Sequence, residues 1–402
     1  MQKQILIAGG GIGGLAAALA ASQAGMAVRL FERAEAFGEI GAGVQLGPNV
    51  VRCLQAWGLR QALQDSAAFP QALVSRNAIT GAELARMPLA GEMERRYGAP
   101  YATIHRADLH QLLLAVVQPR DGIQLNLGCA VESHTDDGRV ATLTLSPRKA
   151  VEGDALIAAD GVWSQTRQRL LGDGPPRVTG HLAYRGAVRQ ADLPAAWRTQ
   201  VVTAWMGPHF HVVHYPVRRG ELLNVVVIVE GPIPEDREQW DHAAHAADMQ
   251  RGLAGAHGTL QAMLQAVTDA GANWRLWPLA DRPPVAGPQQ MAQGLVALLG
   301  DAAHPMRPYL AQGAGMAIED AFELQAALAL RELDMPLRLR RYALNRWQRN
   351  ARVQARSLRN GAIFHATGAM RWGRDWSLRL AGARLMDMPW LYGPAQARPA
   401  GS

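Results

Sequence analysis

The sequence predicts an α/β fold: a nucleotide-binding domain with a glycine-rich turn, a sheet-based domain inserted into it, and a helical C-terminal region. Three observations predict it. A strand–helix–strand pattern occupies residues 4–33, strand-like segments follow one another over residues 175–285, and residues 315–385 are mostly helical in period. A buried strand and glycine turn return at residues 295–304, so we expect the first domain to resume there.

The N-terminal pattern contains every part of a β-α-β unit. An apolar run of strand length at residues 5–8 leads to an Ala- and Leu-rich helix at residues 15–23. Gly25 ends this helix, and a second apolar run follows at residues 28–31. The glycine turn therefore lies at the first crossover of the unit.

The turn has the spacing G-x-G-x-x-G. Gly9 permits a tight turn, Gly11 lets the backbone approach a pyrophosphate, and Gly14 lets helix and strand pack closely. The helix N-terminus offers N–H groups and a positive dipole end to the phosphates. Glu32, at the end of the second strand, is placed to accept hydrogen bonds from ribose hydroxyls. Together these features predict a Rossmann-like dinucleotide site rather than an empty turn or a signal peptide.

The chain between the first unit and the inserted domain alternates loops with short elements. A glycine-rich loop follows Arg33, and Asn49 is expected to cap a helix over residues 50–57. Residues 70–104 alternate as in a small antiparallel sheet, and residues 123–158 contain short strands that return to the main sheet. We expect the glycine-rich loop to lie at the edge of an active site.

Residues 175–285 differ from the preceding chain because strand-like segments follow one another there. HLAYRGAV, VVTAWM, HFHVVHYPV and LLNVVVIVE are strand-like, and a polar acidic stretch after them leads into a helix near residues 247–268. This pattern predicts a second domain built on a sheet.

Composition limits the class of protein. The 402 residues are 49% hydrophobic and 19% charged, as in soluble globular proteins, and no apolar run reaches the roughly 20 residues that cross a bilayer. The first strand begins almost at Met1, so we expect no presequence. Cys53 and Cys129 form neither a metal spacing nor a disulfide framework. These features favour a cytoplasmic protein without a metal or a membrane anchor.

The formal net charge is +7, and the only lysines among the 41 basic residues are Lys3 and Lys149. Arginine favours bidentate recognition of carboxylates and phosphates, so an anionic small substrate and a phosphorylated nicotinamide are natural partners. A basic nucleic-acid binder is the non-enzymatic alternative. The arginines are spread along the chain, which argues against it.

Two further motifs accompany the glycine turn. One is ALIAADGVWSQTR, which contains Asp160 and Gly161, and the other is LLGDAAHPMRPYLAQGAGMAIEDA, which contains Gly300 and Asp301. With the first motif they resemble the three fingerprints of the single-component FAD-dependent aromatic hydroxylases, the para-hydroxybenzoate hydroxylase group. The resemblance extends from residue 4 to about residue 352, with the motifs in the family's order and spacing.

This resemblance implies a Rossmann-like FAD-binding domain of the GR2 type. We expect FAD-binding segments at residues 1–70, 105–174 and 286–355. The remaining segments are a substrate-domain insertion at 71–104, the substrate domain at 175–285 and a helical tail at 356–402.

The resemblance also assigns cofactor roles. Glu32 would hold the adenosine ribose, Arg106 would contact the FAD chain, and Asp160 would lie near the pyrophosphate or serve NAD(P)H. Asp301 would bond the ribityl chain, and the turn at residues 313–316 would direct N–H groups at the flavin. The full set is Gly9, Gly11, Gly14, Glu32, Arg33, Gln45, Arg106, Asp160, Asp301, Gly313 and Ala314. No second G-x-G-x-x-G unit follows, so NADH or NADPH would bind transiently as co-substrate.

The implied reaction is the hydroxylation of a small aromatic acid by a flavin C4a-hydroperoxide formed from reduced FAD and O2. The flavin carries that chemistry, while the protein positions the ring, excludes water and draws a proton from a phenol. The chemistry would therefore lie far from the glycine turn, at the seam between the two domains.

The strand HFHVVHYPV offers the proton acceptor. Alternation places His211 and Tyr215 on one face, with His209, and His214 on the other. Histidine titrates near neutrality, as a phenol-activating base should, and Tyr215 offers a hydroxyl. The alternative is that these histidines are structural groups or part of a solvated strand face.

Within the family the sequence is most similar to the branch of 3-hydroxybenzoate 6-hydroxylase, salicylate hydroxylase and 6-hydroxynicotinate 3-monooxygenase. Three positions depart from it. Pro308 replaces a proton-relay Gln, although its carbonyl can accept a hydrogen bond, and Gln45 and Tyr309 replace histidines of the 6-hydroxynicotinate enzyme. A decarboxylating salicylate-type reaction, a 6-hydroxynicotinate-type reaction and a flavin halogenase remain as alternatives.

The C-terminal tail carries Phe364, Trp372, Trp376 and Trp390. Each aromatic side chain is expected to close the core, with a cover over the active site or a dimer interface as alternatives. The sequence is compatible with a monomer or a homodimer.

Overall fold

The computed structural model describes residues 2–38, 42–232, 242–243 and 246–393. The chain forms two compact units, each with its own principal sheet. The first unit comprises Met1–Ile40, Ala107–Arg177 and Ala280–Leu358. The second comprises Gly41–Arg106, Val178–Leu279 and Arg359–Ser402.

This division differs from the expected segments at two places. Residues 41–70, expected in the nucleotide-binding domain, belong to the second unit, and so does the tail from residue 359. The second unit is therefore assembled from three separated stretches of chain rather than from two.

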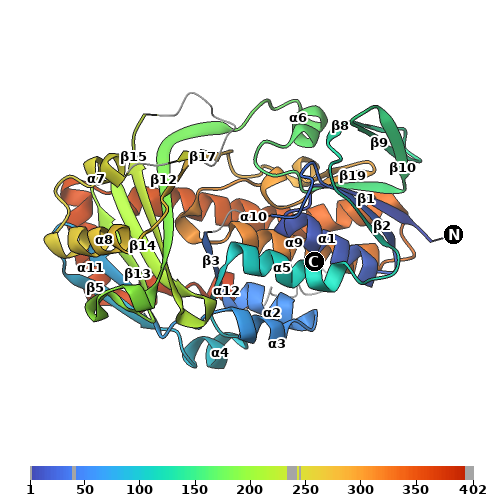
Figure 1. The fold of residues 1–402 in the computed structure, drawn as a ribbon. Coiled ribbons are helices and arrows are strands. Elements are labelled where there is room, and N and C mark those ends of the chain that lie inside the picture. The colour runs from blue at the N-terminus through green and yellow to red at the C-terminus, as the bar shows by residue number, and fades with distance from the viewer. Residues whose placement is uncertain (1, 39–41, 233–241, 244–245, 394–402) are drawn as a thin grey trace. The chain divides into compact units, whose positions relative to one another are not determined.

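The first unit is built on a six-stranded sheet in the order β18-β19-β11-β1-β2-β7 (Figure 1). The pairs from β19 to β7 are parallel, and β18 is antiparallel to β19. The strands are β1 (Gln4–Ala8), β2 (Ala27–Phe31), β7 (Ile123–Asn126), β11 (Ala155–Ala158), β18 (Ala292–Gln293) and β19 (Val296–Leu298). A second, antiparallel sheet has the order β10-β9-β8, with β8 (Val131–Asp136), β9 (Ala141–Leu145) and β10 (Lys149–Gly153).

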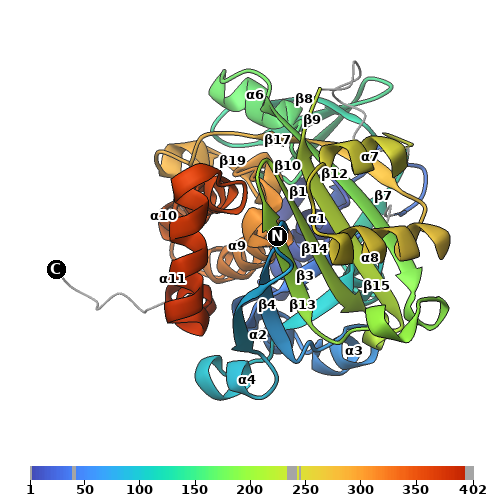
Figure 2. The same ribbon diagram turned by 90° about the vertical axis from the view of Figure 1, so that its left-hand side faces the viewer.

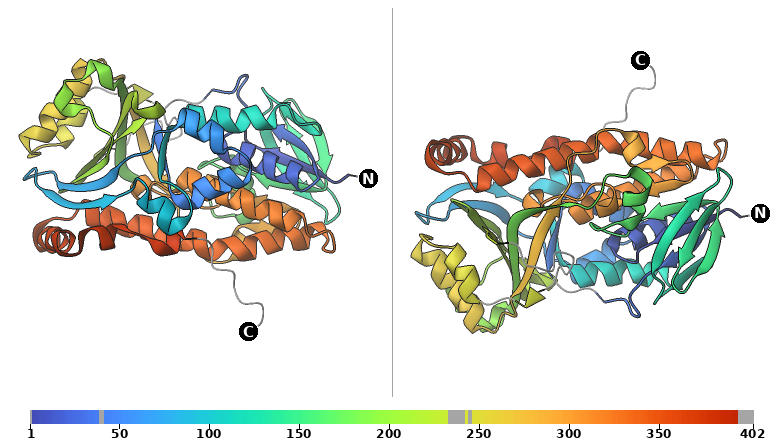
Figure 3. Two further views of the ribbon diagram at one scale, coloured as in Figure 1. Left: turned by 90° about the horizontal axis from the view of Figure 1, so that it is seen from below. Right: turned by 90° about the horizontal axis from the view of Figure 1, so that it is seen from above.

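The helices of this unit follow the strands. They are α1 (Ile12–Gln23), α5 (Arg106–Val117), α6 (Gln165–Leu171), α9 (Gly313–Leu328) and α10 (Met335–Phe364), of which α10 continues into the second unit from residue 359. Figure 3 shows α10 as one long helix drawn from orange to red. Ile5, Leu15 and Leu19 are fully buried, because β1 is an interior strand and α1 packs against both β1 and α9.

The second unit is built on an eight-stranded sheet in the order β16-β17-β12-β15-β14-β13-β4-β5. Its strands are β4 (Ala72–Asn77), β5 (Glu83–Pro88), β12 (Arg177–Arg189), β13 (Val202–Gly207), β14 (Phe210–Val217), β15 (Leu222–Glu230), β16 (His242–Ala243) and β17 (Arg275–Asp281). A separate pair joins β3 (Gly43–Leu46) to β6 (Ala102–His105). The helices are α2 (Pro48–Ala56), α3 (Arg60–Ser66), α4 (Glu92–Tyr97), α7 (Ala246–Gly252), α8 (Gly258–Asp269), α11 (Gly368–Met386) and α12 (Pro389–Tyr392).

One face of the large sheet is apolar and covered. Phe210 and Val212 of β14 join an apolar cluster with Leu260 and Leu264 of α8. Figure 2 shows α7 and α8 lying across this face. Because side chains alternate along a strand, His211 and Tyr215 belong to the opposite face.

Several local expectations are wrong. The hairpin β4–β5 extends the large sheet instead of forming a small one, and two helices, α7 and α8, replace the single helix expected at residues 247–268. Gly47 is the N-cap of α2, and Asn49 is buried inside its first turn, because Pro48 fits the first helical position. Most of the acidic stretch before α7 lies outside the described residues.

The tail differs from expectation as well. Trp372 and Trp376 of α11 are 65% and 61% exposed, so they do not close a core within the described structure. Phe364 instead packs edge-on against the ring of His211, with 5.2 Å between the ring centroids. No described helix is both long enough and apolar enough to cross a membrane.

Candidate active site

The glycine turn of the first unit has the geometry that a dinucleotide requires. Gly9 has φ +100°, and a Cβ atom there would lie 2.4 Å from the carbonyl oxygen of Ala159. A Cβ atom on Gly14 would lie 1.9 Å from the carbonyl oxygen of Gly9. Gly11 is the N-cap of α1 and provides no side chain to cap it, so the first N–H groups of the helix suit a pyrophosphate.

Glu32 is held at the end of β2 by backbone groups. One carboxylate oxygen accepts from the N–H of Gly10 at 2.6 Å and the other from the N–H of Ala34 at 2.9 Å. The side chain is thereby fixed beside the glycine turn, where a ribose bound next to the pyrophosphate would lie. Arg33 is exposed, and no described contact assigns it a role.

Asp160 follows β11 and is only partly satisfied. Its Oδ2 accepts from the N–H of Thr166 at 3.2 Å, whereas Oδ1 is buried without a hydrogen-bond partner among the described residues. A buried carboxylate oxygen without a partner is costly, so it marks a place for a polar group of a ligand or for water. This observation fits a bound dinucleotide.

The second motif is tied to the third through Arg167. Ser164 caps α6 by accepting from the N–H of Arg167 at 2.9 Å. The guanidinium of Arg167 donates to Asp173 at 2.8 Å and to the carbonyl oxygens of Ala302 and Ala303. Arg167 therefore supports the turn that carries Asp301.

That turn lies beside the N-terminus of a long helix. Gly300 has φ +62°, and α9 begins at Gly313 without a side-chain cap from Gln312. A Cβ atom on Gly313 would lie 3.8 Å from Oδ1 of Asp301. The carboxylate and the uncapped N–H groups of α9 can thus serve one ligand with both hydroxyl and carbonyl groups, as the flavin end of FAD has.

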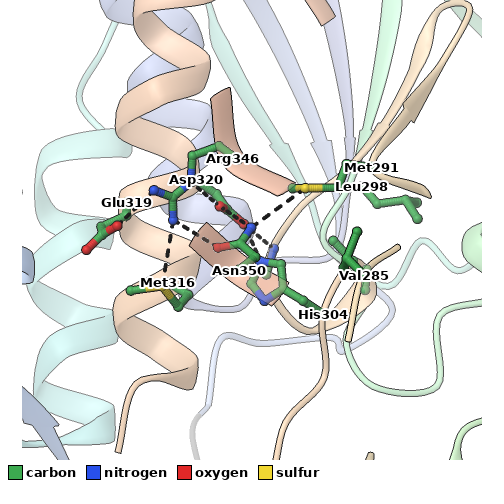
Figure 4. Close-up of polar contacts among 12 residues, drawn as sticks. Val285, Met291, Leu298, His304, Met316, Glu319, Asp320, Arg346 and Asn350 are labelled. Atoms are coloured by element: carbon green, nitrogen blue, oxygen red, sulfur yellow. Dashed lines mark hydrogen bonds and ion pairs between the residues drawn. The ribbon is translucent and has the colours of Figure 1, made fainter. Parts of the chain in front are cut away.

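A buried ionic cluster, missed by sequence reasoning, supports the same turn (Figure 4). Asp320 accepts from Nε of Arg346 at 2.7 Å, from His304 at 2.5 Å and from the N–H of Gly300 at 3.1 Å. Arg346 also donates to Glu319 and Asn350 at 2.8 and 3.0 Å. Burial alone raises the pKa of Asp320, but His304 and Arg346 lower it well below its usual range.

Pro308 also lies in the first unit. It begins a short 3-10 turn in which its carbonyl oxygen accepts from the N–H of Ala311 at 3.0 Å. The carbonyl proposed for a substrate hydroxyl is therefore already engaged once, with a second lone pair remaining.

In the second unit, His211 belongs to a chain of hydrogen bonds. It is 2% exposed, and its Nδ1 lies 2.8 Å from Nε2 of His365. Nδ1 of His365 lies 3.0 Å from Oε1 of Glu230, whose Oε2 lies 2.9 Å from Nδ1 of His209. Burial, with His365 and His181 nearby, lowers the pKa of His211 well below its usual range. His211 is therefore neutral near pH 7, as a proton acceptor must be.

The other histidine of β14 has a different environment. Nε2 of His214 accepts from Nε1 of Trp205 at 3.2 Å, on the covered face of the sheet. Burial lowers the pKa of His214 to about 4. His214 is therefore a neutral structural residue.

Tyr215 lies beside the strand pair β3–β6. A Cβ atom on Gly43 would lie 2.5 Å from Cε2 of Tyr215, and the N–H of Gly43 donates to Asn224 at 2.7 Å. Gln45 accepts from the hydroxyl of Tyr101 at 2.7 Å and also contacts Tyr215. Gln45, expected at the cofactor, thus accompanies the tyrosine expected at the substrate.

Sequence reasoning also missed Arg185. Its guanidinium carbon lies 3.9 Å from the ring centroid of Trp277, and its Nε is buried without a partner among the described residues. Burial lowers the pKa of Arg185 to about 9, although Tyr215 partly opposes this and Arg106 adds to it. No described carboxylate pairs with Arg185. A cation in this position suits an anionic ligand.

Known proteins are similar to this chain over most of its length. The FAD binding domain family matches residues 2–357. The chain is 39% identical over 393 residues to 3-hydroxybenzoate 6-hydroxylase of Polaromonas naphthalenivorans, covering 97% of this chain and 95% of that enzyme. It is 35% identical to 6-hydroxynicotinate 3-monooxygenase of Bordetella bronchiseptica, covering 88% and 90%. The crystal structure of Klebsiella pneumoniae HpxO with FAD and uric acid matches with a TM-score of 0.83 at 26% identity, covering 96% and 94%.

The chain belongs to the FAD-binding aromatic hydroxylase family. It is an FAD-dependent aromatic-ring monooxygenase, and NAD(P)H is the reductant typical of this family. The expected fold class, family and cofactor are confirmed. The roles of the individual site residues stay predictions.

Proposed function

We propose that this enzyme hydroxylates a small aromatic acid that carries a phenol or an equivalent ring hydroxyl. The observation that supports the proposal is Arg185, a partly buried cation beside Tyr215 to which no described carboxylate is paired. A substrate carboxylate would satisfy it. The two relatives named above act, by their names, on 3-hydroxybenzoate and 6-hydroxynicotinate, and both substrates are hydroxylated aromatic acids.

Three side chains of the second unit have separate roles in binding and activating the substrate. Arg185 binds the carboxylate, with Trp277 stacked against the guanidinium. His211 accepts the proton of the ring hydroxyl, which raises the electron density of the ring. Tyr215 donates a hydrogen bond from its hydroxyl, because burial raises its pKa above the usual range and keeps it protonated.

The geometry of the first unit supports the proposed cofactor roles. Gly9, Gly11 and Gly14 would admit the pyrophosphate, Glu32 would bind the ribose, and Asp160 and Asp301 would take hydroxyl or phosphate-linked groups farther along FAD. When bound, FAD supplies the activation of O2 that the protein's own side chains cannot provide. The N–H groups at Gly313 and Ala314 would stabilise negative charge on the ring of a bound flavin.

The test is NADH and NADPH oxidation by the purified protein against hydroxybenzoates and hydroxypyridine carboxylates, with identification of the product. We expect a hydroxybenzoate to stimulate oxidation and to be hydroxylated. Release of CO2 from a labelled carboxyl would instead establish a decarboxylating salicylate-type reaction. Stimulation of NAD(P)H oxidation by 6-hydroxynicotinate alone would establish a 6-hydroxynicotinate-type reaction.

His211→Ala tests the proton acceptor. We expect this variant to retain FAD and to oxidise NAD(P)H, but to release H2O2 in place of hydroxylated product. The substrate hydroxyl then keeps its proton, and the less electron-rich ring is hydroxylated slowly. Hydroxylation at the wild-type rate and coupling would show that His211 is not the base. His257→Asn, at the partly buried N-cap of α8, is the matched control and should behave as wild type, because Asn also caps helices.

A further inference from the structure

The chain of hydrogen bonds beyond His211 ends on an exposed carboxylate. His211 and His365 are buried, whereas the side chain of Glu230 is 41% exposed. The contacts between them measure 2.8 and 3.0 Å. Three residues, from β14, the turn directly after α10 and β15, thus connect the proton acceptor to solvent.

The carboxylate fixes the tautomers along this chain. Glu230 only accepts hydrogen bonds when ionised, so Nδ1 of His365 must be the donor. A neutral His365 then has its lone pair on Nε2, which accepts from Nδ1–H of His211. A neutral His211 with its proton on Nδ1 presents Nε2 as its basic nitrogen.

We infer that His365 and Glu230 form a proton relay that carries the substrate's hydroxyl proton from His211 to solvent. The inference rests on the proposed function. The O–H bond of the substrate breaks as Nε2–H forms on His211, Nδ1–H of His211 passes to Nε2 of His365, and Nδ1–H of His365 passes to Oε1 of Glu230. Glu230 then releases the proton to water. The net change is a phenol converted to a phenolate, one proton in solvent, and His211 and His365 both changed from the Nδ1–H to the Nε2–H tautomer.

Burial explains why a relay is needed. The environment that lowers the pKa of His211 also makes a protonated, buried His211 unfavourable, so the proton should not remain there. Burial raises the pKa of Glu230, but hydrogen bonds from His365 and His209 outweigh it and keep the carboxylate ionised. The reverse passage returns a proton to the oxygen after hydroxylation and restores the starting tautomers.

The charged and titratable groups around the relay come from β12, from the turn before β14 and from α11. His181 of β12 stacks near His365 with 5.2 Å between ring centroids, and His209 holds the second oxygen of Glu230. His209 has φ +62°, an unfavourable backbone conformation for a residue with a side chain. Arg374 of α11 donates to the carbonyl oxygens of Ile363 and Phe364, just before His365. The C-terminal end of α10 is thereby held by Arg374, and His365 directly after it is held by Glu230.

The experiment follows proton loss directly, without turnover. Oxidised holoenzyme with EDTA is mixed with a nitro-substituted hydroxybenzoate, whose phenolate is yellow, and the absorbance is followed after a pH jump. We expect Glu230→Gln and His365→Gln to bind the probe but to slow its ionisation roughly tenfold to 100-fold. Because the outer end of the relay is exposed, formate or imidazole in the buffer should restore the rate in Glu230→Gln but not in His211→Ala.

The controls separate the possible failures. Glu221 directly precedes the other end of β15 and is exposed like Glu230, so Glu221→Gln should ionise the probe at the wild-type rate. Equal rates in wild type, Glu230→Gln and His365→Gln would overturn the relay. Failure of wild type to bind the probe would overturn the proposed substrate class instead. His181, Glu230 and His365 also place ligand atoms within 4.8 Å of one another, so an ionisation rate in wild type that requires added Zn²⁺ would replace the relay with a metal site.

Discussion

Two arginines, one in each unit, have opposite electrostatic environments. Arg346 donates to Asp320, Glu319 and Asn350, and although burial lowers its pKa, the two carboxylates raise it above the usual range. Arg185 has an aromatic ring against it and no described carboxylate, and burial lowers its pKa to about 9.

Under the proposed function, the difference separates a structural charge from a substrate-binding charge. The hydrogen bonds of Arg346 are satisfied within the protein, so the cluster stabilises the fold around Gly300 and Asp301. Arg185 is held against Trp277 without a described carboxylate, so an anionic ligand can pair with it. A satisfied charge thus contributes to stability, and an unsatisfied one contributes to recognition.

The largest effect is expected on the stability of the fold, from a change in the buried cluster around Asp320. Asp320→Ala leaves Arg346 and His304 buried without their shared carboxylate, and should lower the free energy of unfolding by about 3–5 kcal/mol. Chemical denaturation of the purified variant measures it. The flavin content should fall too, because Gly300 loses a hydrogen bond.

Protonation should mimic this substitution. The pKa of Asp320 is depressed in the folded state, so its stabilising contribution is complete above the pKa of an unfolded aspartate and is lost as the pH falls below it. The wild-type protein should lose stability in acid faster than Asp320→Ala does. Exposed Glu332→Gln is the control and should change stability by less than about 0.5 kcal/mol. A parallel acid response in both proteins would contradict a structural role for Asp320.

A smaller effect on affinity is expected on the binding side. Arg185→Met should weaken binding of a hydroxybenzoate by about 1.5–3 kcal/mol, roughly tenfold to 150-fold in Kd, because the charged hydrogen bonds to the carboxylate are lost. Stability should stay constant or rise, since a charge without a counter-ion is removed. Fluorescence titration with 3-hydroxybenzoate and with phenol measures the affinity for a ligand with the carboxylate and for one without it. Unchanged preference for the acid over phenol would mean that Arg185 does not bind the carboxylate.

The smallest effect should come from Arg185→Lys. It retains the charge but loses the planar group that stacks on Trp277, so binding should weaken by about 0.5–1 kcal/mol. The same titration should place it between wild type and Arg185→Met. An affinity equal to that of Arg185→Met would show that planar geometry, rather than charge, decides recognition.

The sequence predicted what short stretches of chain contain. Gly9 and Gly14 lie in the turn after β1, and Asp160 lies in the turn after β11; in both turns the residue types indicated a ligand-binding geometry that the structure has. The alternation of His211 and Tyr215 on β14 follows from the strand period in the same way. The family and FAD dependence followed from three such stretches in order.

Other features could not be read from local pattern. Asn49 resembled a cap but lies inside α2, and the exposed face of α11 carries Trp372 and Trp376 although aromatic side chains are usually buried. The placement of residues 41–70 in the second unit depends on the pairing of β3 with β6, which are separated by more than fifty residues of chain. Such pairings depend on which surfaces meet, and no single segment encodes that.

By itself, therefore, the sequence determined the cofactor and the class of reaction, because phosphate-binding turns are encoded by the backbone freedom of glycine and by a few acids at fixed spacing. Only the tertiary structure decided which side chains accompany His211 and which cation lacks a partner. His365 lies 154 residues from His211, and Trp277 lies on a different strand from Arg185. Burial and hydrogen-bond partners, which set the charge of each group, exist only once the chain is folded.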